Sequence, residues 1–287
     1  MGKGDARVAK QDKAAARLDK EEREEAASLS PPRALVVHEV VRDQGEDEIK
    51  RSTMALSVSG FAAGLSMGFS FLVMAMIWAY LPDAPYRLLL AAPGYASGFL
   101  IVILGRQQLF TETTLTAILP LFTRPGGETL WGAARVWAVV LAANLAGTWV
   151  FAWVLSHDGI FADEIWQALH AIAHQAASAT LFAVVMKSIM AGWLIALIVW
   201  LLPSAGSAQI LVIIILTTIV ALGSMSHAIA GSVEAAWSAL TGETSYASYV
   251  AHFLLPTLLG NTVGGVALTA LLNHAPIAEE LHEGKRP

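Results

Sequence analysis

One histidine lies inside an otherwise apolar stretch of the chain. The stretch 216–234 is apolar on both sides of a short polar cluster, 223–227, which contains His227 and opens with Gly223. Lipid cannot hydrogen-bond the backbone groups that such a break frees, so the break must face a protein-lined cavity. Imidazole titrates near neutral pH and can donate to an anion or share its proton. An ionisable side chain at this depth therefore predicts a functional site.

A second apolar run is interrupted in the same way. Residues 105–114 are polar and include Arg106, Thr111 and Glu112, and the run resumes at Leu115. Neither apolar half reaches the roughly 20 residues that a spanning helix needs. This pattern predicts two half-helices joined by a polar loop within the membrane. Facing lipid would cost Arg106 or Glu112 about 2.5–3.5 kcal/mol each, so we expect both to face inward or to pair with each other.

Simpler explanations exist for these residues. His227 could be a buried histidine satisfied by the hydroxyl of Ser224 or Ser226. Thr111 could cap a helix, as threonine often does. A hydrolase that combines Ser226 or Ser224 with His227 is disfavoured, because such close neighbours on one backbone cannot readily form the serine–histidine hydrogen bond that the chemistry needs.

Composition places the chain among multi-span membrane proteins. Of its 287 residues, 55% are hydrophobic and 14% are charged, and the mean hydropathy is +0.57. These values are too apolar for a soluble domain of this length. The chain has no cysteine, which excludes disulfides and thiol chemistry. The charged N-terminus has no short apolar core, so no cleavable signal peptide is expected.

The predicted organisation is an all-α membrane protein with six transmembrane helices, of which the second and fifth are broken. Lys187 is expected to snorkel at the end of the fourth helix. The loop 156–179 contains several histidines whose spacing fits no recognised metal site. The predicted segments are a charged, disordered cytoplasmic tail (1–33), an amphipathic cytoplasmic helix that lies on the membrane, caps the bundle or serves as a linker (34–51), a six-span channel domain (52–275) and a cytoplasmic C-terminal tail (276–287).

Charge distribution predicts the orientation in the membrane. Eleven of the 18 Lys and Arg residues fall within residues 1–51, whereas the loop 156–179 has none. Six crossings place both termini on one side, and the positive-inside rule makes that side the cytoplasm. The chain is therefore expected in the cell inner (plasma) membrane with both termini in the cytoplasm.

The two halves of the channel domain resemble each other. Thr111 precedes Asn144 by 33 positions, and His227 precedes Asn261 by 34. Three spans in each half give the two copies opposite orientations, and paired broken helices in inverted repeats place a permeation site near the midplane. We expect Asn144 and Asn261 to tie the loop backbone to the bundle.

Three motifs in this order resemble the formate/nitrite transporter family. They are 108–115 (Gln-Leu-Phe-Thr-Glu-Thr-Thr-Leu), 223–232 (Gly-Ser-Met-Ser-His-Ala-Ile-Ala-Gly-Ser) and 254–265 (Leu-Leu-Pro-Thr-Leu-Leu-Gly-Asn-Thr-Val-Gly-Gly). The resemblance implies an aquaporin-like protomer, a homopentamer and one pore per protomer. It gives Thr111 the role of the gating threonine, in the Leu109-Phe110-Thr111 core, and gives His227 the role of the central histidine. It also implies that Leu109 and Val220 line an inner constriction, with Tyr95 and Ile195 near an outer one.

The sequence departs from the family pattern at several positions. Gly231 stands where the family usually has asparagine, and 174–178 lacks the lysine of the family's vestibule. Arg106 and Glu112 stand where family channels tend to have small residues; Arg106 is either a structural charge or a substitute for that lysine. The expected function is a channel or transporter for small monovalent anions such as formate or nitrite. The alternative is the same fold conducting a neutral or cationic small solute. We expect no cofactor, no metal site and no nucleic-acid partner.

Overall fold

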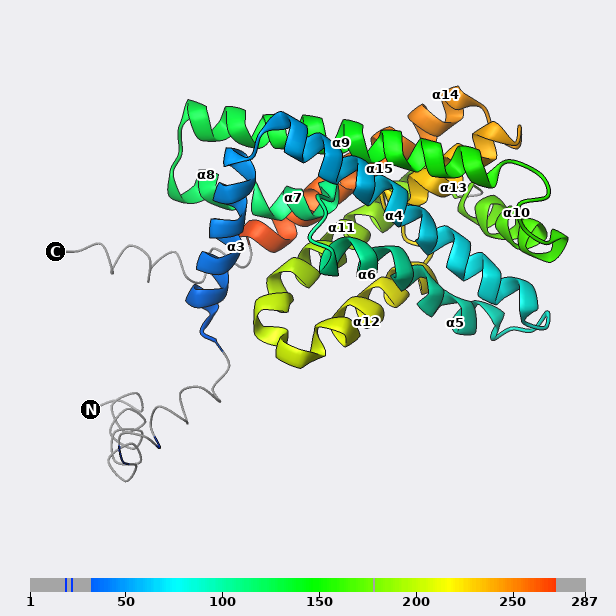
Figure 1. Ribbon diagram of the computed structural model, residues 1–287, viewed down its shortest axis with the longest axis horizontal. Helices are drawn as coiled ribbons and strands as arrows, with labels where there is room; N and C mark the ends of the chain where they lie inside the picture. Colours follow the sequence, from blue (N-terminus) through cyan, green and yellow to red (C-terminus); the bar gives the residue numbers. More distant parts are fainter. Residues whose placement is uncertain (1–18, 20–21, 23–31, 178, 272–287) are drawn as a thin grey trace.

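The structure is a computed structural model that describes residues 19, 22, 32–177 and 179–271. Every regular element within these residues is helical. The predicted tail 1–33 lies almost wholly outside the described residues, and the predicted tail 276–287 lies wholly outside them. Figure 1 shows an elongated helical bundle, with α3 (Ala34–Lys50) lying across one end of it.

Two long helices form one side of the bundle. α4 (Thr53–Tyr80) makes its most extensive helix contact with α9 (Gly127–Leu155). The two backbones lie so close that a Cβ atom on Gly64 would overlap the carbonyl group of Asn144, and one on Gly147 would overlap the backbone at Phe61. Small residues at a helix interface allow this close approach. The glycines of the first apolar span therefore position Asn144 against α4.

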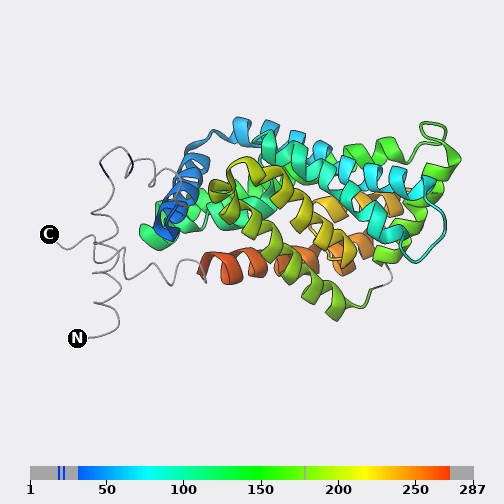
Figure 2. The same cartoon turned by 90° about the horizontal axis from the view of Figure 1, so that it is seen from below.

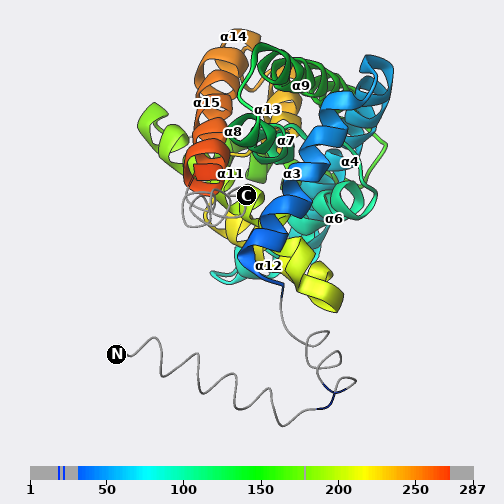
Figure 3. The same cartoon turned by 90° about the vertical axis from the view of Figure 1, so that its left-hand side faces the viewer.

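The second apolar run is broken in the structure. Its first part ends with α6 (Ala96–Leu104), and an extended segment leads to the short helix α7 (Phe110–Thr116). α7 lies inside the bundle, surrounded by longer helices, when the molecule is viewed from the end that carries α3 (Figure 3). The other elements of this run are α5 (Arg87–Ala91), the 3-10 helix η1 (Ala92–Tyr95) and α8 (Leu119–Thr123).

The fifth apolar run is broken as well. α11 (Leu181–Ala205) continues through Pro203, and the chain reverses at Gly206, whose φ of 51° suits glycine. α12 (Gln209–Leu222) then leads to the break, which α13 (Ala230–Leu240) follows. The chain continues through the 3-10 helix η2 (Gly206–Ala208) before α12 and, after α13, through α14 (Tyr246–Ser248), the π-helix η3 (Tyr249–Leu254), α15 (Leu255–Val263) and the π-helix η4 (Gly264–Leu271).

The expected loop 156–179 is a helix over most of its length, so that prediction was wrong. α10 (Asp163–Ala177) buries Ile165, Leu169 and Ile172. These apolar residues recur every three or four positions, which is the pattern of an amphipathic helix. α10 packs against α4 and α13 and covers one end of the bundle.

The described residues contain five continuous helical stretches that are long and apolar enough to cross a membrane. One of them, Leu181–Leu222, includes the reversal at Gly206 and so comprises both α11 and α12. Figure 2 shows these helices running broadly along one axis of the molecule. Their length and apolar composition are those of an all-helical membrane protein.

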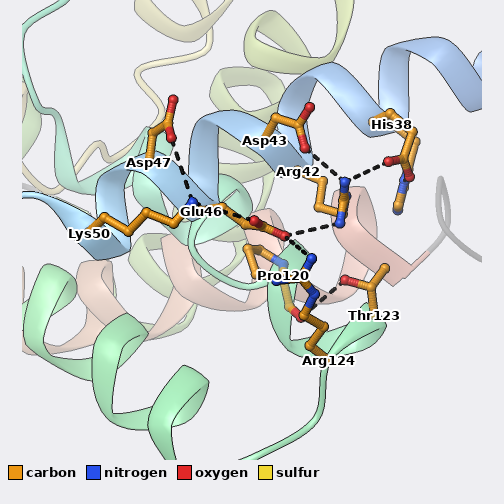
Figure 4. Close-up of polar contacts among 10 residues, drawn as sticks. His38, Arg42, Asp43, Glu46, Asp47, Lys50, Pro120, Thr123 and Arg124 are labelled. Atoms are coloured by element: carbon orange, nitrogen blue, oxygen red, sulfur yellow. Dashed lines mark hydrogen bonds and ion pairs between the residues drawn. The ribbon is translucent and has the colours of Figure 1, made fainter.

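α3 docks across the end of the bundle. Val37, Val41 and Gly45 on one face are buried, and a Cβ atom on Gly45 would overlap the carbonyl group of Thr116 in α7. The opposite face is charged, and Figure 4 shows Glu46 between Arg42 (3.0 Å) and Arg124 (3.6 Å). α3 is therefore a capping helix that contacts the short helices behind the first break.

Candidate functional site

The two breaks have the same backbone geometry. The chain turns through the left-handed region at Arg106 (φ 52°) and at Ser224 (φ 45°), each directly after a glycine. Few residues other than glycine adopt this region. In each break the next backbone N–H donates back to the helix that has just ended: Gln107 to the carbonyl of Val102 (3.0 Å), and Met225 to the carbonyl of Val220 (2.9 Å).

Asn144 and Asn261 hold the two breaks in equivalent ways. Asn144 Oδ1 accepts from the N–H of Phe110 (2.9 Å), and Asn261 Oδ1 accepts from the N–H of Ala228 (2.8 Å). Each Nδ2 donates to one carbonyl in its break and to one in a neighbouring long helix: Gln108 (2.9 Å) and Gly60 (2.7 Å) for Asn144, and Ser226 (3.0 Å) and Ser188 (2.7 Å) for Asn261. Both side chains are fully buried. Each asparagine thus satisfies backbone groups that the break leaves without helical partners.

These equivalences pair His227 with Leu109. Phe110 corresponds to Ala228 and Gln108 to Ser226, so the residues between them correspond too. In the sequence, the similar distances to the asparagines suggested that Thr111 is the counterpart of His227. The structural counterpart is Leu109, two positions earlier. The backbone is repeated, but the side chains that it carries are different.

Thr111 and His227 nevertheless meet. Thr111 Oγ1 lies 2.8 Å from His227 Nε2, and both side chains are fully buried. The ring of Phe99 packs edge-on against the imidazole, with 5.1 Å between ring centroids. The contact joins α7, just after the first break, to the second break.

The hydrogen bonds around His227 determine its tautomer. The N–H of Ala230, at the start of α13, donates to His227 Nδ1 (3.1 Å). A neutral imidazole that accepts at Nδ1 carries its proton on Nε2. Nε2–H therefore donates to Thr111 Oγ1, which leaves the hydroxyl proton of Thr111 free to donate to another group.

A small cavity of about 70 Å³ adjoins His227, and we call it the His227 cavity. Its lining includes the predicted pore residues Tyr95, Val220 and Ser226. It also includes Lys187 and Glu234. Val220 thus lies beside the same cavity as Tyr95, whereas the resemblance placed these two residues at opposite constrictions.

Four other predicted pore residues, Thr111, Leu109, Phe110 and Ile195, are not among the residues that line the His227 cavity. Leu109, Phe110 and Ile195 are buried, at 0%, 4% and 0% exposure. Gly231 leaves room for the ring of Phe253, because a Cβ atom there would lie 2.7 Å from the ring carbon Cζ. Gly231 and Phe253 both line the His227 cavity. An aromatic ring thus occupies space beside the position where the family usually has asparagine.

A larger cavity of about 480 Å³ lies between α3 and the first break, and we call it the Glu48 cavity. Its lining includes Glu48 from α3, Arg106 and Gln108 from the break, and Glu112 from α7. Arg106 is exposed at this cavity, and within the described residues it forms no ion pair with Glu112. The two charges thus face one cavity, as expected of inward-facing residues, but they are not bonded to each other.

Glu48 connects α3 to the first break. Its carboxylate accepts hydrogen bonds from Thr116 Oγ1 and from Gln108 Nε2, the latter at 3.4 Å. Burial raises the pKa of the Glu48 carboxyl to about 7, although these hydrogen bonds and the nearby charge of Arg51 act in the opposite direction. Glu48 belongs to α3, which is not among the helices long and apolar enough to cross a membrane.

Sequence reasoning missed Lys187, Glu234 and Glu48 as cavity residues. Lys187 belongs to the long helix α11 and Glu234 to the shorter helix α13, and one sequence does not reveal which way an isolated charge on an apolar helix points. The signal that could have found them is the free-energy cost of a charged side chain in lipid, because a charged residue within a span usually faces a cavity. Glu48 could not be found in this way, because its position depends on how α3 docks.

The sequence matches the family described as formate/nitrite transporter over residues 35–275. The chain is 40% identical to the inner membrane protein YfdC of Escherichia coli over 256 residues, which cover 89% of this chain and 83% of YfdC. It is 23% identical to the uncharacterized transporter YrhG of Bacillus subtilis, over 82% of this chain and 90% of YrhG.

Solved structures share the fold. A pentameric formate channel with formate bound aligns with a TM-score of 0.65 and 20% identity, over 77% of this chain and 95% of the channel. An ion channel of the FNT family aligns with a TM-score of 0.66 and 22% identity, over 85% and 96%. The family consists of channels and transporters and not of enzymes. With its matched region, its relatives and its fold in agreement, this chain belongs to the formate/nitrite transporter family.

Proposed function

We propose that the protein conducts small monovalent anions, such as formate or nitrite, through a pore whose narrowest part carries Thr111 and His227. The observation that supports this most is the 2.8 Å contact between Thr111 Oγ1 and His227 Nε2 beside the His227 cavity. The contact aligns a row of donors, from Ala230 N–H through the imidazole to the threonine hydroxyl. The free hydroxyl proton at the end of this row suits an anion.

Lys187 supports the same proposal. It lines the His227 cavity, where an ammonium group attracts anions that have lost part of their hydration. In this role it replaces the vestibule lysine that 174–178 lacks. The anion then accepts a hydrogen bond from Thr111 where water is excluded. A low local dielectric raises the pKa of a carboxylic acid, so proton uptake and passage as the neutral acid are favoured there.

The membrane arrangement is part of the proposal. Treating α11 and α12 as separate crossings gives six spans, and the matched hydrogen bonds at the two breaks support two three-helix repeats of opposite orientation. A homopentamer in the cell inner membrane, with cytoplasmic termini, follows by analogy with the pentameric formate channel and with YfdC. The cavity lined by α3 then faces the cytoplasm.

Proteoliposome uptake tests the proposal. Formate and nitrite should enter liposomes that contain the wild-type protein faster than ammonium or a neutral solute of similar size. Thr111→Val removes the hydroxyl donor with little change in shape. The lost hydrogen bond to a charged group, about 1.5–3 kcal/mol, should slow formate uptake by about tenfold or more. Thr123→Val is the matched control, because the Thr123 hydroxyl donates only to the carbonyl of Pro120. Equal rates for Thr111→Val and wild type would exclude the proposed hydrogen bond.

The alternative is a neutral or cationic small solute. Glu234 at one cavity and Glu112 at the other favour it, because carboxylates on the path repel anions. The same uptake assay separates the two functions: an alternative cargo requires that ammonium or the neutral solute enters faster than formate.

A further inference from the structure

The ring of Phe253 lies between two cavities. One is the His227 cavity, and the other is a cavity of about 90 Å³, which we call the Ser248 cavity. Three residues line both cavities: Ala179, Gly231 and Phe253. Alanine and glycine have little or no side chain, so the Phe253 ring is the bulkiest group that the two cavities share. Its removal would extend one cavity into the other.

Gly231 provides the space that this ring occupies. A Cβ atom on Gly231 would lie 2.7 Å from Cζ and 3.0 Å from Cε2 of Phe253, and the three nearest atoms from other elements all belong to the ring. Protein interiors are close-packed, so a side chain at position 231 would displace the ring. Gly231 belongs to α13 and Phe253 to η3, and these two elements pack against each other. The position of the ring therefore depends on this pair of residues.

Neighbouring side chains hold the Phe253 ring in place. Tyr249, four residues earlier in η3, stacks on it with 6.2 Å between the ring centroids and 28° between the ring planes. The Tyr249 hydroxyl donates to Ser232 Oγ (3.1 Å), and both side chains are buried. The ring of Trp149 packs edge-on against Tyr249, with 5.2 Å between centroids. Because η3 is a π-helix, a rare form that occurs frequently at functional sites, the placement of this ring is a candidate for a functional role.

The Ser248 cavity offers polar groups to a solute. Its lining includes Thr244, Ser248 and His252, whereas no Asp, Glu, Lys or Arg among the described residues lines it. Residues of α10, α13 and α14 contribute to it, and Figure 1 shows these helices in the half of the bundle away from α3. A solute that extended past the Phe253 ring would find hydrogen-bond partners there. The ring, and not a lack of polar groups, therefore limits how large such a solute can be.

We propose that the ring of Phe253 sets the size limit for the solute that the His227 cavity admits. This inference rests on the proposed pore at His227 and narrows its substrate class: formate and nitrite are admitted, and monocarboxylates with longer carbon chains are excluded. A pocket that cannot hold an added methyl group rejects the larger solute by about 10- to 200-fold. Selection of this kind depends on the dimensions of the path as well as on the groups that line it.

Uptake into proteoliposomes tests the size limit, because formate and acetate carry the same charge and differ by one methyl group. The ratio of their uptake rates in Phe253→Ala is divided by the wild-type ratio, so the different acid strengths of the two acids cancel. Phe253→Ala should admit acetate about tenfold better relative to formate, because loss of the ring joins the two cavities. Phe182→Ala is the matched control, since Phe182 is 75% exposed on α11 and lines neither cavity. An unchanged ratio in folded Phe253→Ala would overturn the proposal.

A second substitution separates the size limit from a general loss of structure. In the Phe253→Ala background, Gly231→Leu has room for its side chain and should refill the space, so the preference for formate should return toward the wild-type value. Damage to the fold would not be repaired in this way. Phe253→Leu keeps part of the bulk and should shift the ratio less in the same direction. It replaces Phe253→Ala if the Tm shows that Phe253→Ala does not fold.

The wild-type measurement distinguishes this inference from the proposed function. If wild-type liposomes take up ammonium and not formate, the anion proposal fails. Ammonium and methylammonium, which also differ by one methyl group, then replace formate and acetate in the same variants, and their ratio decides the size limit. If wild-type formate uptake is observed and the ratio does not change in folded Phe253→Ala, the size limit alone is refuted.

Discussion

The two breaks share the same backbone geometry but carry different side chains. At each, a glycine ends the helix, the next residue is left-handed, and a buried asparagine makes two hydrogen bonds to the loop and a third to a neighbouring long helix. The first break carries Leu109 where the second carries His227. The shared backbone geometry and asparagine hydrogen bonds explain how a membrane protein tolerates an interrupted helix. The side chains that differ between the breaks are the ones that can carry function.

The cavities differ in the same way. The His227 cavity is lined by a lysine and a glutamate beside the imidazole, whereas the Glu48 cavity is lined by three carboxylates and two arginines. In the proposed pore, a solute would therefore meet different charges at the two cavities.

The largest effects should come from removing the shared scaffold. Asn144→Ala and Asn261→Ala each delete three buried hydrogen bonds and leave backbone groups unpaired. At about 1–3 kcal/mol for each orphaned group, either variant should lose about 3 kcal/mol of stability or more. Thermal unfolding in detergent measures this. A large loss for one asparagine and none for the other would contradict the equivalence of the two breaks.

Substitutions at the close helix contacts beside these asparagines should have an intermediate effect on stability. A Cβ atom on Gly64 would overlap the carbonyl group of Asn144, and one on Gly192 would overlap that of Asn261. Overpacking of this kind costs about 1–3 kcal/mol, so Gly64→Ala and Gly192→Ala should both lower the Tm. Gly126→Ala is the control, since no atom lies within 4 Å of its Cβ position. Stability unchanged at Gly64 and Gly192 would show that the helices can separate freely.

The smallest effect should come from Glu48, which accepts one hydrogen bond from Gln108 in the first break and one from Thr116 in α7. Burial raises the pKa of this carboxyl from 4.5 to about 7, so the folded protein favours the protonated form. Its contribution to stability is fully present below pH 4.5 and is lost as the pH rises through 7. Glu48→Gln mimics the protonated acid and should be more stable than wild type at about pH 8.5, by on the order of 1 kcal/mol, with a smaller difference at about pH 5.5. Unfolding curves at both pH values measure the difference.

A comparison with Glu128→Gln isolates this carboxyl. That exposed residue lies outside both cavities, so its substitution should not alter the pH dependence. A wild-type pH dependence in Glu48→Gln would assign the titration to another group.

Sequence reasoning located the breaks because polar residues within apolar runs are energetically costly in lipid. Unpaired backbone groups within a membrane have a high free-energy cost, so the polar segments 105–114 and 223–227 could be recognised as breaks from the sequence alone. The roles expected for Thr111 and His227 came from a family resemblance, but their direct contact was not predicted, since no local pattern joins residues that lie 116 positions apart.

Other features depended on packing or were misjudged. The buried residues of α10 follow a helical period, but the acidic residues and histidines between them led to the prediction of a loop. The placement of Glu48 depends on Gly45 letting α3 approach α7, which a single sequence does not show. The match between Thr111 and His227 in the repeat was off by two positions, because a similar spacing to an asparagine along the sequence does not establish an equivalent backbone position.

The most direct test of the proposed pore gives the second break the side chain of the first. His227→Leu places leucine at the position that Leu109 occupies in the other break. Formate uptake into proteoliposomes is measured from about pH 5.5 to 8.0, with the Tm as the check on folding. We predict a folded protein whose formate uptake falls at least tenfold and no longer varies with pH as in wild type. A folded His227→Leu variant with wild-type rate and pH dependence would contradict the assignment of the pore to His227.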